Sequence, residues 1–198
     1  MKKFLPLIII AAVLFGIFQW GIGINNKMVE MNGQAVKQWA NVESSYQRRS
    51  DLIGNLVKTV QGAADFERGT LTDVIEARAK ATSVNIDASN LTAENMAQFQ
   101  EAQSGLSSAL SRLLVSVERY PELKANQNFL ELQSQIEGTE NRINVERNRF
   151  NDAAGEYNIY IKKIPNNFIA GFGGHQAMSL FQAEKGAEKA PEVEFNFK

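Results

Sequence analysis

The sequence of 198 residues contains no cysteine, one histidine and four prolines. Without cysteine the chain has no disulfide bond, no cysteine-ligated zinc or iron–sulfur cluster and no thiol nucleophile. The single histidine, His175, excludes a metal site built from several histidines of one chain. The scarcity of proline favours long helices over many short strands. We therefore expect an all-α protein, and we expect no metal and no cofactor.

An excess of charge is also missing. The 21 lysines and arginines nearly balance the 22 aspartates and glutamates, so that the net charge is −1 at pH 7. Domains that bind nucleic acid usually carry a clear basic surplus. We therefore expect no nucleic-acid partner.

Charged residues are absent from residues 4–26, which directly follow Lys2 and Lys3. A run of this length is long enough to cross the hydrocarbon core of a bilayer, about 30 Å thick, as one helix. A cleaved signal peptide would have a shorter apolar region and small residues before the cleavage site. A helix that is apolar on every face lies in the core of a large protein or spans a membrane, and in a chain of this size such a run favours the span over a buried core helix. The sequence therefore predicts that residues 1–26 form an N-terminal membrane anchor with a single transmembrane helix.

Apolar residues at helical spacing of three and four recur throughout residues 39–165, as in helices that pack against other helices. The first of these helices is expected to run from Trp39 to about Ala81, with Gly54, Gly62 and Gly69 as weak points that allow close packing or a kink near Gly69. The second ends at Pro121 and the third before Pro165, because a residue that precedes proline is pushed out of helical geometry. These lengths predict an up-and-down antiparallel bundle of three to four long helices.

The remaining segments flank this bundle. Residues 27–38 are polar and are expected to form a juxtamembrane connector. Residues 166–198 form a tail that is rich in glycine and aromatic residues and then becomes charged, with "VEFNF" as its one candidate strand. Its apolar segment 167–181 is expected to cover the end of the bundle, with contact to the membrane surface or binding of a partner as the alternatives, and His175 is expected to be a solvated loop residue. Either the tail or the polar segment 84–98 is expected to supply the fourth, shorter helix.

Polar residues interrupt the apolar seams of the first and last bundle helices. Arg49 occupies a seam position of the first helix, and Glu146 occupies one of the last. A buried charge is tolerated only when it is paired and hydrogen-bonded. We therefore predict a structural polar layer between helices, formed by Arg48, Arg49, Asp51, Asn55, Glu140, Asn141, Glu146, Arg147 and Asn151.

The two neighbouring arginines of this layer are expected to differ. Arg49 should be buried and paired with Glu140 or Glu146, so that removing it would leave a buried carboxylate without a partner. Arg48 should lie nearer the surface and pair with Asp51.

The same acidic residues offer a catalytic alternative. Asp51, Glu137, Glu140 and Glu146 are the candidates for a carboxylate-based hydrolase or metal enzyme. Carboxylate-bridged di-iron bundles need Glu-x-x-His pairs on two helices. The single histidine of this chain lies outside the helical pattern, which favours the structural layer over a catalytic site.

Three stretches in combination resemble the LemA family: "WANVESSYQRRSDLIGNLVKTVQGAADFERGTL" with the following "EARAKA", and "RYPELKANQNFLELQSQIEGTENRINVERNRFNDAAGEYNIYIKKIP". The order of elements is similar over about residues 4–198. The resemblance implies a bacterial, membrane-anchored helical bundle, similar in fold to four-helix up-and-down bundles, without enzymatic activity. The chain departs from the family at Gly54, where the pattern often has a proline. Glycine there avoids the bend that a proline would force.

These observations lead us to expect a non-enzymatic scaffold or adaptor for other envelope proteins. An oligomer that shapes the membrane is a further alternative, so a homo-oligomer is also considered. Lys2, Lys3 and the amino terminus precede the span, Lys27 and Lys37 follow it, and the side with more basic charge is favoured in the cytoplasm. We therefore expect a single-pass protein of the cytoplasmic (inner) membrane, with a cytoplasmic N-terminus, a bundle outside the cytoplasm and bilayer contact through residues 4–26.

Overall fold

The structure is a computed structural model that describes residues 4–62, 66–88 and 90–182. All regular secondary structure in these residues is helical, as predicted. The helices are α1 (Leu5–Gln61), α2 (Arg68–Ser83), α3 (Ala93–Val117), α4 (Pro121–Lys124), α5 (Gln127–Lys162) and α6 (Asn166–Gly173).

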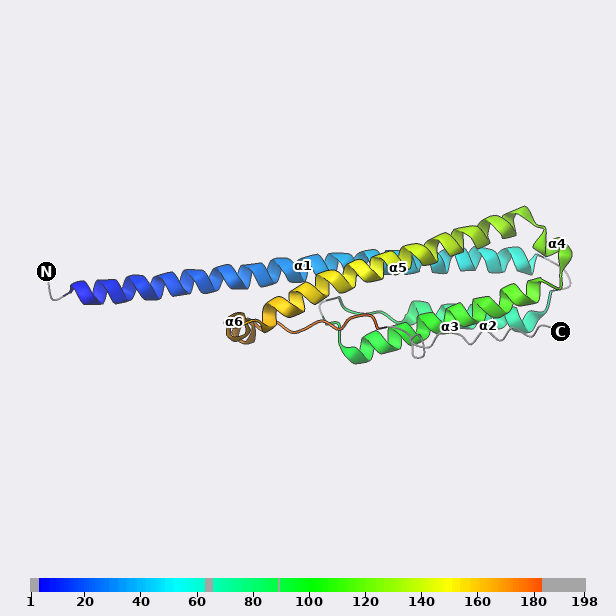
Figure 1. Ribbon diagram of the computed structural model, residues 1–198. Coiled ribbons are helices and arrows are strands. Elements are labelled where there is room, and N and C mark those ends of the chain that lie inside the picture. Colours follow the sequence, from blue (N-terminus) through cyan, green and yellow to red (C-terminus); the bar gives the residue numbers. More distant parts are fainter. Residues whose placement is uncertain (1–3, 63–65, 89, 183–198) are drawn as a thin grey trace, which may run out of the picture.

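Two antiparallel helix pairs form the bundle (Figure 1). The long helices α1 and α5 pack against each other, α2 packs against α3, and contacts between α1 and α2 join the two pairs. The single turn of α4 carries the chain from α3 into α5. The predicted antiparallel bundle of long helices is therefore confirmed.

The core of the bundle consists of two apolar clusters. In the cluster nearer the N-terminus, the indole of Trp39 lies 5.4 Å from the ring of Phe99, 5.3 Å from that of Phe150 and 5.7 Å from that of Phe181, between ring centroids. Aromatic pairs at such separations add stability beyond the burial of their surface. The other cluster is mostly leucine, isoleucine and valine and fills the far end of the bundle.

The first bundle helix is shorter than the sequence predicts. A helix from Trp39 to Ala81 is wrong, because α1 ends at Gln61 with Gly62 as its C-cap and α2 then begins at Arg68. The apolar spacing continues across this turn since both helices bury the same kind of face in one core. The fourth long helix arises from this division. The tail supplies a shorter helix, as predicted, whereas the described residues of segment 84–98 form none of their own.

The bundle also begins earlier than expected. Residues 27–38, predicted to be a connector, belong to α1, and Met28 and Ala35 are fully buried in the aromatic cluster. Ile24 is also part of that core, at 7 % exposure. The span therefore passes into the bundle without an intervening linker.

Before Ile24, α1 projects beyond the bundle as an apolar rod (Figure 1). Its large hydrophobic side chains from Phe4 to Ile22 are 40–66 % exposed. In the described part of the chain, α1 is the one helix whose length and composition suit a membrane span, and the qualifying window lies near the N-terminus. Apolar surface of this extent is stable in lipid, so this portion of α1 provides membrane anchoring.

The start of the tail is ordered against the bundle. Residues 166–173 form α6, which contacts both α1 and α5. Residues 175–182 then run back along α5, and Phe181 enters the aromatic cluster. The tail thus covers the bundle as predicted, while the candidate strand "VEFNF" lies outside the described residues.

Candidate functional site

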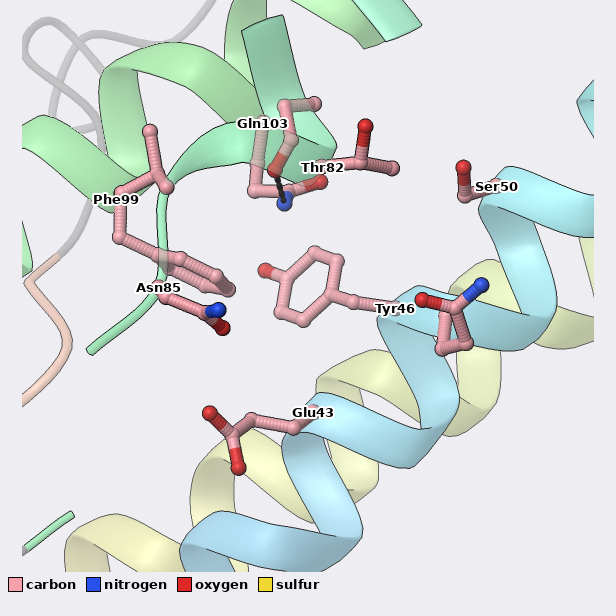
Figure 2. Close-up of a pocket in the computed structure, with 10 residues that line it drawn as sticks. Glu43, Tyr46, Ser50, Thr82, Asn85, Phe99 and Gln103 are labelled. Atoms are coloured by element: carbon pink, nitrogen blue, oxygen red, sulfur yellow. Dashed lines mark hydrogen bonds between the residues drawn. The ribbon is translucent and has the colours of Figure 1, made fainter. Parts of the chain in front are cut away.

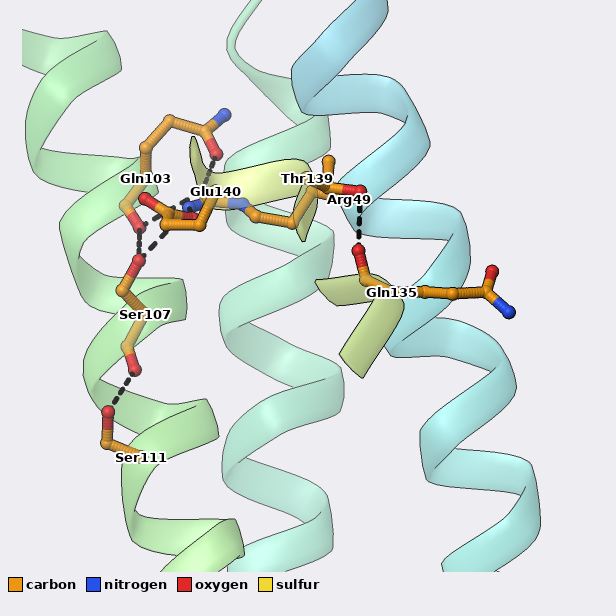
Figure 3. Close-up of polar contacts among 7 residues, drawn as sticks. All are labelled: Arg49, Gln103, Ser107, Ser111, Gln135, Thr139 and Glu140. Atoms are coloured by element: carbon orange, nitrogen blue, oxygen red, sulfur yellow. Dashed lines mark hydrogen bonds and ion pairs between the residues drawn. The ribbon is translucent and has the colours of Figure 1, made fainter. Parts of the chain in front are cut away.

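Arg49 is the centre of the polar layer (Figure 3). Its side chain is 3 % exposed, and Nη1 donates to Oε2 of Glu140 at 2.7 Å and to Oγ of Ser107 at 3.2 Å. Nη2 donates to Oε1 of Gln103 at 2.6 Å. Of the two carboxylates expected for Arg49, the structure therefore places Glu140 at the guanidinium.

This network reaches all four long helices. Arg49 belongs to α1, Glu140 to α5, and Gln103 and Ser107 to α3. The amide of Gln103 also donates from Nε2 to the backbone oxygen of Ala81 on α2 at 3.3 Å. One buried guanidinium and one amide therefore connect the four helices at a single level.

The network separates the two apolar clusters. On α1, Arg49 lies between Tyr46 of the aromatic cluster and Leu52 of the aliphatic cluster. Gln103 and Glu140 occupy the same intermediate position on α3 and α5. A helix that slid by one turn would move Arg49 into apolar surroundings, so the network fixes the register of the bundle.

Burial is unequal across the central ion pair. The side chain of Glu140 is 46 % exposed, whereas that of Arg49 is 3 % exposed. The guanidinium also lies over the ring of Tyr46, 4.9 Å from the centroid, which favours a cation over the face of the ring. Nε of Arg49 is buried with no hydrogen-bond acceptor among the described residues. The buried charge is thus the arginine, and its contacts other than Glu140, namely Ser107, Gln103 and Tyr46, are neutral.

Three other predicted members lie outside this network. Arg48, Asn55 and Asn141 are exposed. The expected pair of Arg48 with Asp51 is wrong, because Oδ1 of Asp51 accepts from Nε2 of Gln47 at 3.0 Å and lies 3.8 Å from Nη2 of Arg78. The helical spacing of Arg48 and Asp51 allows their contact, but the carboxylate contacts Gln47 and the interhelical Arg78 instead.

Glu146 forms a separate polar contact. It is 5 % exposed, and its Oε1 accepts from Nη1 of Arg149 at 3.0 Å, while its Oε2 is buried without a partner in the described structure. Three of the four carboxylates of the catalytic alternative therefore have different arginine partners: Arg78 for Asp51, Arg49 for Glu140 and Arg149 for Glu146. The fourth, Glu137, is exposed and accepts from Nε2 of Gln133 at 3.2 Å. Among the described residues no three histidine, aspartate or glutamate side chains gather closely enough to hold a metal ion.

Gly54 makes room for an arginine. A Cβ atom at this position would lie 3.2 Å from Cζ and 3.3 Å from Nε of Arg78. Arg78 crosses α1 here and donates from Nε to the backbone oxygen of Ser50 at 2.8 Å. The absence of a side chain at Gly54 thus lets a side chain from α2 bind the backbone of α1.

Two asparagines of α5 bind the tail through its backbone. Oδ1 of Asn158 accepts from the backbone N–H of Met178 and its Nδ2 donates to the carbonyl of the same residue, both at 2.8 Å. Asn151 makes the same two bonds to Phe181, at 2.9 and 3.1 Å. The two asparagines are seven residues apart on the helix, a rise of about 10.5 Å, and the two tail residues are three apart in an extended segment, about 10 Å. The distance between the asparagines therefore matches the distance between the backbone groups that they bind. Asn151, predicted to be part of the polar layer, instead holds the tail.

Two side chains near the tail complete this binding. Nη2 of Arg147 donates to the backbone oxygen of Gln182 at 3.4 Å, and its guanidinium lies 4.6 Å from the ring centroid of Phe181. His175 is half-buried between Oδ1 of Asn25 at 3.1 Å from Nε2 and the hydroxyl of Tyr157 at 3.4 Å from Nδ1. The expectation of a solvated His175 is therefore wrong, because α6 turns the loop back onto the bundle.

A cleft of about 550 Å³ opens beside the network. It is bounded by α1, α3, α5 and the end of the ordered tail, with Arg49 and Gln103 at its base and Gln100, Ser104 and Arg147 among the residues that line it. Gln100 donates from Nε2 to the backbone oxygen of Gln182 at 3.1 Å. The cleft therefore already binds a backbone carbonyl of an extended segment at one edge.

A smaller cavity of about 90 Å³ lies beside the cleft between α1, α2 and α3 (Figure 2). Glu43, Tyr46, Ser50 and Phe99 are among the residues around it. Burial raises the pKa of the Glu43 carboxyl and of the Tyr46 hydroxyl. A cavity of this size has room for a few water molecules, which suits its polar lining.

Comparisons with known proteins support a single family. The sequence model of the LemA family matches residues 38–195. Two MamQ magnetosome proteins of Paramagnetospirillum magneticum are 28 % identical over 183 aligned positions, covering 84 % of this chain and 67 % of each relative. The LemA protein of Metamycoplasma hominis is 22 % identical over 164 positions, covering 83 % of this chain and 71 % of the relative.

Proposed function

Because the chain belongs to the LemA family, we propose that it is a non-enzymatic adaptor that binds an extended segment of another envelope protein. In this proposal α1 tethers the bundle to the membrane, and the cleft between α3 and α5 receives the segment. The similar proteins are named MamQ magnetosome proteins and LemA, and neither name denotes a reaction.

The observation that carries the proposal is the pair of hydrogen bonds to the backbone oxygen of Gln182. Two side chains that line the cleft, Gln100 and Arg147, both donate to the backbone oxygen of this residue. Recognition through backbone carbonyls is suited to an extended polypeptide and demands little of its sequence. A second segment could extend from this edge into the cleft and meet the same type of donor.

The base of the cleft supports binding rather than chemistry. Arg49 is held by Glu140, Gln103 and Ser107, and arginine does not release its proton in proteins. A fixed, charged and hydrogen-bonded base keeps its shape when a ligand arrives, so little order has to be created on binding. The same network that sets the helix register thus provides a rigid receiving surface.

Position-specific cross-linking in cells tests the adaptor role. A photoreactive amino acid at Ser104, which is exposed and lines the cleft, should give a cross-link to another envelope protein. The control is Val115, which is 72 % exposed on α3 but lies outside the cleft. Replacing both Gln100 and Arg147 by alanine should lower the yield at Ser104. Equal cross-links at both positions, or cross-links only to a second copy of the chain, would contradict the proposal.

We also propose that the bundle lies outside the cytoplasm and that the N-terminus lies inside. Lys2 and Lys3 support this orientation through the positive-inside rule. Protease added to cells with a permeabilised outer layer should then digest the bundle. Three lysines inserted after Asn26 should weaken that result. A bundle that is protected in spheroplasts and digested only after lysis would show the opposite orientation.

A further inference from the structure

The short helix α6 presents an apolar face that no part of the bundle within the described residues covers. Ile164, just before the helix, is 81 % exposed, Phe168 is 64 % exposed and Phe172 is 95 % exposed. Phe168 and Phe172 are spaced four apart within the helix and so lie on one side of it. The opposite side is the one that packs, because Asn166 and Ala170 are buried. Helix α6 therefore has one face on the bundle and one apolar face without a protein partner in the described structure.

The level of α6 along α1 coincides with the end of the membrane span. A Cβ atom at Gly21 would lie 3.9 Å from Cδ1 of Ile169, which places α6 beside this part of α1. From Phe4 to Gly21, the uncharged helix rises about 27 Å at 1.5 Å per residue. The hydrocarbon core of a bilayer is about 30 Å thick. If the span fills that core, then α6 lies at the surface of the membrane on the bundle side.

The direction of α6 fits the same location. In Figure 1 the helix is seen nearly end-on while α1 runs across the view, so its axis crosses that of α1. Between the two helices lies a hollow of about 710 Å³, lined by Trp20 and Phe18 of α1 and by Phe168 and Phe172, with Asn25 as its polar exception. Its apolar lining is continuous with the lipid-facing surface of the span, so lipid is the solvent that reaches it.

The charges nearest to α6 along the sequence have one sign. Lys162 and Lys163 are separated from it only by Ile164 and Pro165 and are exposed, and the sequence contains no aspartate or glutamate between Glu156 and Glu184. Amphipathic helices that lie in the interface combine basic residues, which attract anionic headgroups, with aromatic and aliphatic residues that enter the acyl region. Tryptophan is also enriched at this level, as at Trp20.

We propose that α6 is an interfacial membrane helix: its Phe168 and Phe172, with the exposed Ile164 just before it, enter the bundle-side leaflet of the bilayer that α1 spans. Lys162 and Lys163 then lie at the level of the lipid phosphates. A second copy of the chain is a weaker occupant, because three side chains offer on the order of 500 Å², taking about 200 Å² for each phenylalanine. Stable protein interfaces bury about 800 Å² on each partner. This inference rests on the span of α1 and is independent of the adaptor role.

The absence of cysteine makes a direct depth measurement practical. Single-cysteine variants Phe172→Cys, Leu14→Cys and Val115→Cys of the full chain are labelled with a nitroxide and placed in phospholipid nanodiscs that contain phosphatidylglycerol. Collision rates with oxygen, which concentrates in lipid, are then compared with those of a water-soluble nickel complex. All three sites have more than half of their side chain exposed, so the labels should not disturb the fold.

The label at residue 172 should favour oxygen over nickel, as the label at residue 14 in the span does, while the label at 115 should favour nickel. A label at 172 that behaves like the one at 115, with residue 14 still in lipid, would overturn the proposal. An aqueous label at 14 would instead show that the span itself is wrong. Loss of access to both reagents at 172 in densely loaded vesicles, but not in nanodiscs with one chain each, would identify a second copy as the occupant and would also overturn it.

Discussion

Removal of the Glu140 carboxylate is the sharpest test of the buried network. The sequence leads to the expectation that loss of Arg49 leaves a buried carboxylate unpaired, but the structure reverses this asymmetry. The carboxylate is 46 % exposed and can be solvated in place, whereas the guanidinium is 3 % exposed and cannot. Glu140→Ala therefore leaves a buried charge without its counter-ion, and Arg49→Met removes the buried charge altogether.

The expected magnitudes follow from this difference. Breaking a buried pair from one side typically costs about 3–5 kcal/mol. Gln103 and Ser107 remain as neutral acceptors for the guanidinium, so we expect about 2–3 kcal/mol for Glu140→Ala. Arg49→Met should cost about 1–2 kcal/mol, because it leaves the carbonyl of the Gln103 amide unpaired. In the Arg49→Met background the Glu140 change should cost less than about 0.5 kcal/mol, as for an ordinary surface substitution.

A second arginine–glutamate pair serves as a matched control. Nη2 of Arg119 lies 2.7 Å from Oε2 of Glu67, the same distance as in the central pair, but the arginine side chain is 66 % exposed. Exposed pairs typically contribute below about 1 kcal/mol. Urea unfolding of the full chain in detergent micelles, followed by circular dichroism, gives the coupling free energy of each pair from a double-mutant cycle.

We expect a coupling of about 2 kcal/mol for Arg49 with Glu140 and below about 1 kcal/mol for the control pair. Equal couplings would refute the reasoning, because distance and chemistry are the same in the two pairs and burial of the arginine is the variable. A larger loss from Arg49→Met than from Glu140→Ala would also contradict it.

Three further changes test other parts of the fold. Gly138→Ala should raise the free energy of unfolding by up to about 1 kcal/mol, because no atom lies near the added methyl group. Gly54→Ala should raise the free energy of unfolding by less, or lower it, because its methyl group would press on the interhelical Arg78. The urea midpoints of the two variants test this difference. Asn158→Ala should destabilise the protein by about 1–3 kcal/mol and speed hydrogen exchange in residues 175–182, because the backbone N–H and carbonyl of Met178 lose their partner. Asn144→Ala, exposed on the same helix, is the control and should have neither effect. Burial raises the pKa of Glu43, so the folded state binds this proton more tightly than the unfolded state, and the stability that this contributes below about pH 4.5 is lost as the pH rises. The free energy of unfolding of Glu43→Gln should therefore rise relative to that of the wild type between pH 4.5 and neutrality. A difference in free energy that stays constant across that range would refute the direction of the shift.

Much of the fold follows from local patterns in the sequence. The uncharged run before Lys27, the apolar spacing and the prolines at 121 and 165 are local signals, and the anchor, the all-α class and the ends of α3 and α5 follow from them. The turn after Gln61 escapes such reasoning. Gly62 is a local weak point, but the apolar spacing on both sides of it is helical. The glycine alone does not distinguish a helix end from a continuous helix, so the division depends on how the two halves pack.

The site was predictable in part for a similar reason. Arg49 stands at a seam position, and a buried arginine needs an acceptor, so its burial and its pairing with Glu140 or Glu146 follow from the spacing. The choice of Glu140 depends on how α1 and α5 pack. The sequence does not single out Gln103 and Ser107, because neutral polar residues on a helix rich in serine can lie at the surface and need no charged partner. A glutamine within the apolar spacing between Phe99 and Leu106 is the signal that was available.

The unbroken passage of α1 from the bilayer into the bundle has a mechanical consequence. From Ile24 to Gln61 the helix extends about 55 Å beyond the span at 1.5 Å per residue, so it acts as a lever whose short arm lies in the lipid. Transmembrane helices adjust their tilt when the thickness of the bilayer changes. A change of 10° would sweep the far end of such an arm through about 10 Å, by simple geometry on the helix rise. The position of the distal half of the molecule is thereby tied to the thickness of the membrane that holds it.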